Sequence, residues 1–224
     1  MQSDYYSDKL SAEKLRRVYE IAPPRVRQYL DAEIRHLLSL VCPGDFVLEL
    51  GCGYGRVLKQ VAQRVGELYG IDTSISSLRL ARQSLSAHKN VFLAQMNAAH
   101  LAFRDHCFDV VVCIQNGISA FHVDQRQLIQ ESIRVTKRGG QVLFASYSDK
   151  FWDDRLSWFE LQAQHGLLGE IDYEKTGNGT IVCKDGFTAT TVNEAGFRAL
   201  TNELDASVQI YEVDGSSVFC EIKV

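Results

Sequence analysis

A glycine-rich loop with a carboxylate on either side is the stretch of this sequence best suited to binding chemistry. Glycine occupies every second position from Gly51 to Gly55, shortly after Glu49. Glycines let the backbone turn sharply and approach a ligand closely. Asp72 follows the loop by about twenty residues. Folds with such loops place a carboxylate at this spacing, where it binds the ribose hydroxyls of a ligand. These residues predict a nucleoside ligand.

The charges around the loop narrow the class of nucleoside. Glu49 would repel a pyrophosphate and attract a cationic group. Arg56 stands where a dinucleotide-binding fingerprint needs a small residue, and the loop lacks the Gly-Lys-Ser/Thr sequence of a Walker-type phosphate loop. An adenosine ligand with a positively charged tail satisfies all of these constraints.

The segments around the loop predict an α/β fold. Phe46–Leu50 is apolar apart from Glu49, as expected of a buried strand, and residues 57–65 have the apolar spacing of a helix. Strand and helix patterns then alternate as far as Tyr147, which predicts a doubly wound, mostly parallel, Rossmann-like sheet. Further strands are expected at residues 67–72, 91–95, 108–114 and 141–147, and further helices at 74–86, with Ser74 as its N-cap, and 125–136.

The chain as a whole reads as one domain, residues 1–224, with additions at both ends of the core. Its expected segments are an N-terminal helical lid (1–41), a cofactor-binding core (42–149), a small cap insertion (150–190), and a closing helix with an antiparallel hairpin (191–224).

Local signals place the elements of these additions. In the lid, Pro23 and Pro24 separate two helices. The cap is expected to hold a helix to about residue 165 and then short antiparallel strands. A capping box from Thr191 to Glu194 opens the closing helix, and Asp214–Gly215 turns the hairpin.

Composition excludes several classes of function. The net charge is −4 and the chain lacks a dense basic block, which argues against nucleic-acid binding. No apolar run is long enough to span a membrane, and the first eight residues do not resemble a signal peptide. The six cysteines are scattered and the histidines lack metal-ligand spacing. We therefore expect no metal site, and free thiols in a reducing cytoplasm.

Five segments, taken in order, resemble the motifs of class I S-adenosylmethionine-dependent methyltransferases. Glu49–Gly55 is similar to the first signature motif, and the likeness extends over residues 42–147. The remaining four segments are Gly70–Ser74, the acidic second motif; Met96–Phe103, the adenine-contacting segment; Phe108–Val112, the fourth-strand motif; and Val135–Gly140, the turn before the fifth strand. The resemblance implies S-adenosyl-L-methionine as the cofactor.

The same resemblance implies roles for single residues. Gly51 and Gly53, with Glu49 and Cys52 in the same loop, would lie against the methionine and ribose portions of the cofactor. Asp72 would accept hydrogen bonds from the ribose hydroxyls. The remaining implied contacts are Thr73 and Ala98 at the adenine ring, Asn97 at its amino group, and Gln115 beside the methionyl tail. Asn97 replaces the usual aspartate of the family, and its amide carbonyl can still accept a hydrogen bond.

The predicted reaction is in-line transfer of the methyl group to a small-molecule acceptor, in which positioning supplies most of the catalysis. His122, shortly after the fourth strand, is the candidate general base, because an imidazole titrates near neutral pH. A surface histidine near Asp124 is the alternative interpretation. Asn116, Tyr147, Trp152 and Tyr173 are candidates to line the acceptor pocket, with core packing as the alternative for the aromatic residues.

Other functions remain open at this point. The chain would also suit a catalytically silent S-adenosylmethionine-binding regulatory or partner protein. A nicotinamide-dependent oxidoreductase would share the sheet, although Glu49 and Arg56 argue against it. The scattered cysteines argue against arsenic as the acceptor. Five arginines of the lid, at positions 16, 17, 25, 27 and 35, are expected to form a solvated helix face rather than to contact an anionic substrate.

Overall fold

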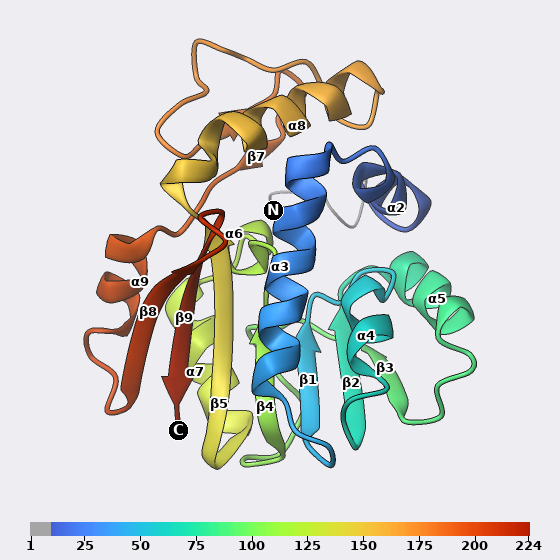
Figure 1. Cartoon of the computed structure of the whole chain (residues 1–224), viewed down its shortest axis with the longest axis vertical. Helices are drawn as coiled ribbons and strands as arrows, with labels where there is room; N and C mark the ends of the chain where they lie inside the picture. Colours follow the sequence, from blue (N-terminus) through green and yellow to red (C-terminus); the bar gives the residue numbers. More distant parts are fainter. Residues whose placement is uncertain (1–9) are drawn as a thin grey trace.

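A seven-stranded sheet in the order β3-β2-β1-β4-β5-β9-β8 runs through the middle of the molecule (Figure 1). In the computed structural model, which describes residues 10–224, the strands are β1 (Phe46–Leu50), β2 (Glu67–Asp72), β3 (Val91–Gln95), β4 (Phe108–Cys113), β5 (Thr136–Tyr147), β8 (Ser207–Val213) and β9 (Ser217–Lys223). Residues 1–9 lie outside the described residues. They include the first part of the predicted lid and the residues on which the prediction about a signal peptide depends.

The strand order confirms the predicted doubly wound fold. β1 pairs in parallel with β2 and with β4, so the chain reverses its direction of winding between these neighbours. β5 continues the parallel part of the sheet, and β9 and β8 add the predicted antiparallel hairpin to it. Ligands of such sheets bind beyond the carboxyl ends of the strands at this reversal. The glycine loop after β1 lies there.

Helices cover both faces of the sheet (Figure 1). One apolar core packs α3, α4 and α5 against one face, and a second packs α7 and α9 against the other. The helices are α2 (Glu13–Glu20), α3 (Pro24–Leu40), α4 (Arg56–Val61), α5 (Ile75–Ser84), α6 (Gly117–Ala120), α7 (Gln125–Val135), the 3-10 helix η1 (Asp149–Phe151), α8 (Trp152–Gln164) and α9 (Glu194–Thr201). Ser74 caps α5 as predicted, because its side chain accepts from Ser77 N.

A third apolar core joins the N-terminal helices to the segment after β5. Val18 and Tyr29 pack with Tyr147, Phe151 and Trp158. The indole of Trp158 also donates a hydrogen bond to the Val18 carbonyl at 3.2 Å. In Figure 1, α2 and α8 lie together above the carboxyl ends of the parallel strands. The helices α2 and α8 therefore form one layer over the carboxyl ends of the strands, which we call the roof.

Two local predictions need correction. The capping box at Thr191 is wrong, because Asn193 is the N-cap of α9 and accepts from Gly196 N. β5 begins at Thr136 rather than at residue 141, after a shift of register against β4 between Phe108 and Val110. The short antiparallel strands predicted for the cap are β6 (Ile181–Val182) and β7 (Thr188–Ala189).

The closing hairpin turns at Asp214 and Gly215 as predicted. Both residues have φ of 60°, the left-handed conformation that a two-residue hairpin turn needs and that Asp and Gly tolerate best. Within residues 10–224, no helix combines the length and the apolarity that crossing a membrane requires.

Candidate functional site

A cavity of about 520 Å³ lies between the carboxyl ends of the parallel strands and the roof of α2 and α8. It is lined by every residue that the sequence predicted for cofactor binding and by the candidate general base, namely Glu49, Gly51, Cys52, Gly53, Asp72, Thr73, Asn97, Ala98, Gln115 and His122. Its volume suits a nucleoside-sized ligand with room for a second small molecule.

The glycine loop forms the floor of the cavity through its backbone conformation. Gly51, Gly53 and Gly55 all have positive φ, at 71°, 53° and 84°. A Cβ atom at Gly51 would lie 2.4 Å from the ring of Phe121, so this position has no room for a side chain. The Cys52 N–H donates to the Ile71 carbonyl at 2.9 Å, which holds the loop against β2. The loop is therefore rigidly shaped by glycine and by the neighbouring strand.

Asp72, at the end of β2, holds two backbone segments at once. Its Oδ2 accepts from Gly53 N at 2.9 Å and its Oδ1 from Ser74 N at 2.8 Å. The carboxylate predicted for the ribose thus also fixes the glycine loop and the start of α5. The next residue, Thr73, lines the cavity, and its carbonyl accepts a hydrogen bond from the Gln95 side-chain amide at 2.8 Å.

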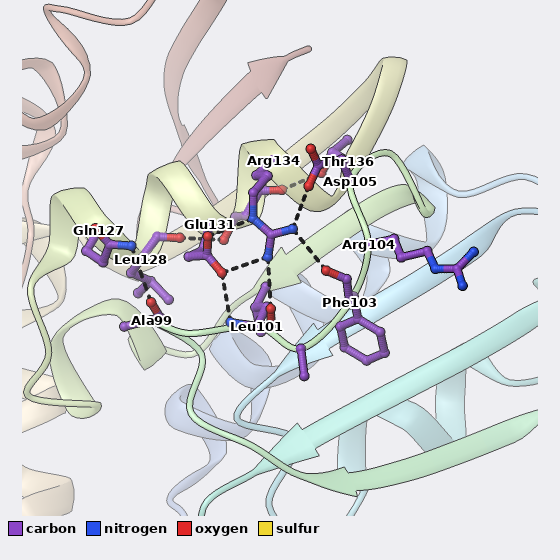
Figure 2. A network of polar contacts seen from close by, with 12 residues as sticks. Ala99, Leu101, Phe103, Arg104, Asp105, Gln127, Leu128, Glu131, Arg134 and Thr136 are labelled. Atoms are coloured by element: carbon purple, nitrogen blue, oxygen red, sulfur yellow. Dashed lines mark hydrogen bonds and ion pairs between the residues drawn. The ribbon is translucent and has the colours of Figure 1, made fainter.

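The segment after β3 carries Asn97 and Ala98 and is fastened to α7 (Figure 2). Arg134 donates to the carbonyls of Leu101 and Phe103, both at 2.9 Å, and to the Asp105 carboxylate at 2.7 Å. Glu131 accepts from Leu101 N at 2.8 Å and pairs with Arg134, whose guanidinium lowers the pKa of this carboxyl. Sequence reasoning missed this clamp.

Asn97 itself is turned toward its own loop. Its Oδ1 accepts from Ala99 N at 2.9 Å. A carbonyl oxygen has a second lone pair, so this bond leaves room for the predicted contact with an amino group.

The loop after β4 is held in an unusual conformation by three other elements. Gln115 and Asn116 both have positive φ, at 57° and 62°. Glu33 of α3 accepts from Gln115 N at 2.7 Å. The Asn116 amide donates to the Thr190 carbonyl and accepts from Ser146 Oγ, at 2.9 and 2.7 Å. Asn116 lines the cavity as predicted, but its polar atoms also bind the loop to the cap.

Two carboxyl groups are buried beside the cavity. Glu33 has no exposed surface and Glu49 is 5% exposed. Burial raises the pKa of Glu33 to about 7 and that of Glu49 to about 8, while nearby Arg56 opposes both shifts. Ser217 Oγ donates to Glu33 at 2.6 Å, whereas the Oε2 atom of Glu49 lacks a partner among the described residues. Glu33 was missed, although an acid among Leu30, Ile34 and Leu37 on an apolar helix face was a readable signal.

His122 lies at the exposed rim of the cavity. Its φ is 51°, which directs the chain from α6 toward α7. Asp124, the partner in the alternative interpretation, uses its carboxylate to cap α7 by accepting from Gln127 N at 2.9 Å. His122 therefore has access both to the cavity and to solvent.

The roof end of the cavity is built from aromatic side chains. Tyr19 comes from α2, Tyr147 from β5, and Trp158 and Phe159 from α8. The amide side chain of Gln162 joins them and is 2% exposed. Of the predicted acceptor residues, Tyr147 lines the cavity, but Trp152 does not, and Tyr173 is 64% exposed and donates to Glu160.

The arginines of the lid mostly face solvent. Arg16 pairs with Glu13, and Arg17 with Glu20, on the exposed side of α2. Arg25 pairs with Asp214 of the closing hairpin at 2.6 Å.

In the part of the chain that the structure describes, no group of three or more His, Cys, Asp or Glu side chains is placed to hold a metal ion.

The central segment of the chain is similar to known proteins. Residues 47–140 match the family model described as a methyltransferase domain. An arsenite methyltransferase of Aquipseudomonas alcaligenes is 32% identical over 59% of this chain and 41% of its own length. A demethylmenaquinone methyltransferase of Thermobifida fusca is 32% identical over 47% of this chain and 44% of its own length. The chain thus spans less than half the length of each of these two curated relatives.

Solved structures share the fold over nearly the whole chain. A protein from Pyrococcus horikoshii has a TM-score of 0.64 with 20% identity, covering 99% of this chain and 96% of that one. An S-adenosylmethionine-dependent methyltransferase from Aquifex aeolicus has a TM-score of 0.62 with 15% identity, covering 93% and 98%. At these identities the likeness concerns the fold.

Proposed function

We propose that the chain is a class I S-adenosylmethionine-dependent methyltransferase, which transfers the methyl group of S-adenosyl-L-methionine to a small organic acceptor. One observation carries the proposal. The residues that the sequence assigned to the cofactor line one cavity together with His122, Asn116 and Tyr147, at the point where the sheet reverses its winding.

The residues of the cavity fit the cofactor. The Oε2 atom of Glu49 is buried and lacks a partner in the described chain, as suits a carboxylate that receives a cationic group of a ligand. Asp72 would accept from the ribose hydroxyls, Thr73, Asn97 and Ala98 would border the adenine, and Gln115 the tail. Bound S-adenosylmethionine supplies an electrophilic methyl group. The protein contributes position and the exclusion of water, through the glycine loop and the roof of α2 and α8.

The acceptor would occupy the roof end of the cavity. Its walls are the aromatic rings of Tyr147, Trp158 and Phe159, with Gln162 as a polar group. Flat aromatic walls favour an organic ring over an inorganic acceptor. By their names, the two curated relatives described above act on arsenite and on demethylmenaquinone. The ring-lined end suits an acceptor of the demethylmenaquinone type. Cys52 is the cysteine that lines the cavity among the described residues, so the thiolates that arsenic would need are not gathered there.

A general base would be needed only for an acceptor that arrives protonated. His122 is the candidate, because it lies on the cavity rim and can return the proton to solvent. The chemistry of the acceptor decides whether this step occurs.

Calorimetric titration tests the cofactor, with S-adenosylmethionine, S-adenosylhomocysteine and a nicotinamide dinucleotide injected in parallel. We expect the two sulfur nucleosides to bind and the dinucleotide not to bind. Binding of the dinucleotide alone would favour the oxidoreductase. A screen of metabolite extract with isotope-labelled cofactor then identifies the acceptor. If the cofactor binds but no metabolite gains label, a silent S-adenosylmethionine-binding regulatory or partner protein is the better description.

A further inference from the structure

Arg56 presents buried donors to the cavity that no protein group receives. It begins α4 directly after Gly55 and lines the cavity. Its Nε and one of its terminal nitrogens, Nη2, are buried and have no hydrogen-bond partner among residues 10–224. A buried charged donor without a partner is costly, so such a group calls for an explanation.

The environment of Arg56 holds the guanidinium in place without satisfying it. Its guanidinium carbon lies over the ring of Tyr19 from α2, 4.7 Å from the ring centroid. Such a contact stabilises a cation but accepts no in-plane hydrogen bond. Arg134, in contrast, spends its donors on two backbone carbonyls and two carboxylates. The free in-plane edge of Arg56 is the part that suits a carboxylate, whose two oxygens match the guanidinium fork.

Glu49 presents a carboxyl group to the same cavity. Its Oε2 is also buried without a partner in the described chain, and nearby Arg56 favours its ionised form. A bound ammonium group would favour the ionised form as well, so the two unsatisfied groups match a ligand that carries both an ammonium and a carboxylate. An α-amino acid carries these two groups on one carbon atom.

We propose that Arg56 binds the α-carboxylate of the cofactor's amino-acid tail, while Glu49 receives its ammonium group. The inference rests on the proposed function, since it assigns a residue to one part of that cofactor. In this arrangement the roof contributes to cofactor binding, because Tyr19 of α2 holds the guanidinium toward the tail. The cavity thereby distinguishes a complete amino-acid tail from a truncated one.

The test pairs a change in the protein with a change in the ligand. Wild type and Arg56→Met are titrated by calorimetry with S-adenosylhomocysteine and with its decarboxylated analogue, which keeps the ammonium. We expect Arg56→Met to weaken binding of S-adenosylhomocysteine by about 10–100-fold, the range for a hydrogen-bonded charged group, and to leave the analogue's affinity within about threefold. Arg56→Lys should recover part of the loss, because a point charge replaces the fork.

Controls separate this role from a loss of folding or of charge. Arg16→Met removes an exposed, paired arginine of α2 and should leave both affinities unchanged. Thermal melting of each variant checks the fold. Equal losses for both ligands, or no loss for either, would overturn the proposal; the second result is also the one expected if Arg56 instead meets a carboxylate of the acceptor. Failure of the wild type to bind S-adenosylhomocysteine would instead reject the proposed function.

Discussion

The two ends of the cavity are built in different ways. The cofactor end, on the loops after β1, β2, β3 and β4, depends on backbone conformation, and Gly51, Gly53, Gln115 and Asn116 all have positive φ. The roof end depends on side chains of α2, β5 and α8 that pack into one apolar core. A site made of backbone needs particular residue types, whereas a site made of packed side chains needs only apolar surface of the right shape.

Charge divides the two ends as well. Glu33, Glu49 and Asp72 lie at or beside the cofactor end. Behind the roof end lies Arg155, which is 1% exposed and donates to the carbonyls of Gly179 and Ala189 at 2.8 and 2.9 Å. Its guanidinium also lies over the Tyr147 ring, 4.6 Å from the centroid. Arg155 therefore ties the cap together, while Arg56 faces the cavity.

The largest expected effect lies where the two ends meet. We expect His122→Asn to reduce kcat about 10²–10⁴-fold, because general-base catalysis contributes this much, with cofactor affinity unchanged. Asparagine tolerates the positive φ at this position. His100→Asn, at an exposed residue outside the lining, is the control. A kcat for His122→Asn within threefold of wild type would make His122 a surface residue. The measurement uses the acceptor found in the screen.

A second effect concerns pH and the buried carboxyl groups of the cofactor end. Glu33 ionises at about 7 in the folded chain, against its ordinary value of 4.5. Between these values the folded chain keeps a proton that the unfolded chain has lost. The free energy of unfolding should therefore fall as pH rises through this window, by about 3 kcal/mol.

Urea unfolding at pH 5, 6 and 7 measures this slope in the absence of ligand. Glu33→Gln should flatten it, and Glu13→Gln, an exposed control in α2, should not. Glu49 acts in the same direction up to its higher pKa of about 8, so part of the slope should remain in Glu33→Gln. Identical slopes for wild type and Glu33→Gln would show that this carboxyl does not carry the pH dependence.

The glycine loop should respond to a single methyl group. We expect Gly51→Ala to lower stability by about 2 kcal/mol and to weaken cofactor binding, because its Cβ would meet Phe121 at 2.4 Å. Gly139→Ala provides the matched control, since φ is also positive there and nothing lies within 4 Å of the added atom. Chemical denaturation and calorimetry measure the two effects. Equal results for the pair would mean that backbone strain alone is responsible.

The smallest expected effect lies at the roof end. Gln162→Leu removes a buried amide from the lining with little change in volume. We expect about a tenfold rise in the KM of the acceptor, from the loss of one hydrogen bond, and unchanged affinity for S-adenosylhomocysteine. Gln63→Leu, at an exposed position outside this cavity, is the control. A change in cofactor affinity instead would contradict the division between the two ends.

Much of the fold could be predicted from the sequence because the elements of the core have strong local signals. The buried strands, the turn at Asp214–Gly215 and the Ser74 cap all depend on residues close together in the chain. The errors have two causes. Asn193, two residues after Thr191, is the N-cap of α9 in place of the expected capping box. β5 was extended at its start by pairing with β4, a strand distant in the chain.

The residues predicted for the site lie together for the same reason. Each lies at or after the carboxyl end of a strand of the parallel sheet, and these strand ends meet at one edge. Their chemical roles stay predictions. Glu33 and the Arg134 clamp were missed, because their partners Gln115, Ser217 and Leu101 are far from them in the chain.

The sequence by itself determined the sheet and the glycine loop and predicted a class of ligand, since residue type sets backbone conformation and local charge. Only the tertiary structure decided which aromatic rings line the roof, which carboxyl groups are buried, and that Arg56 faces the cavity with unsatisfied donors. Burial and the pairing of polar groups depend on contacts between segments far apart in the chain, so no local pattern specifies them.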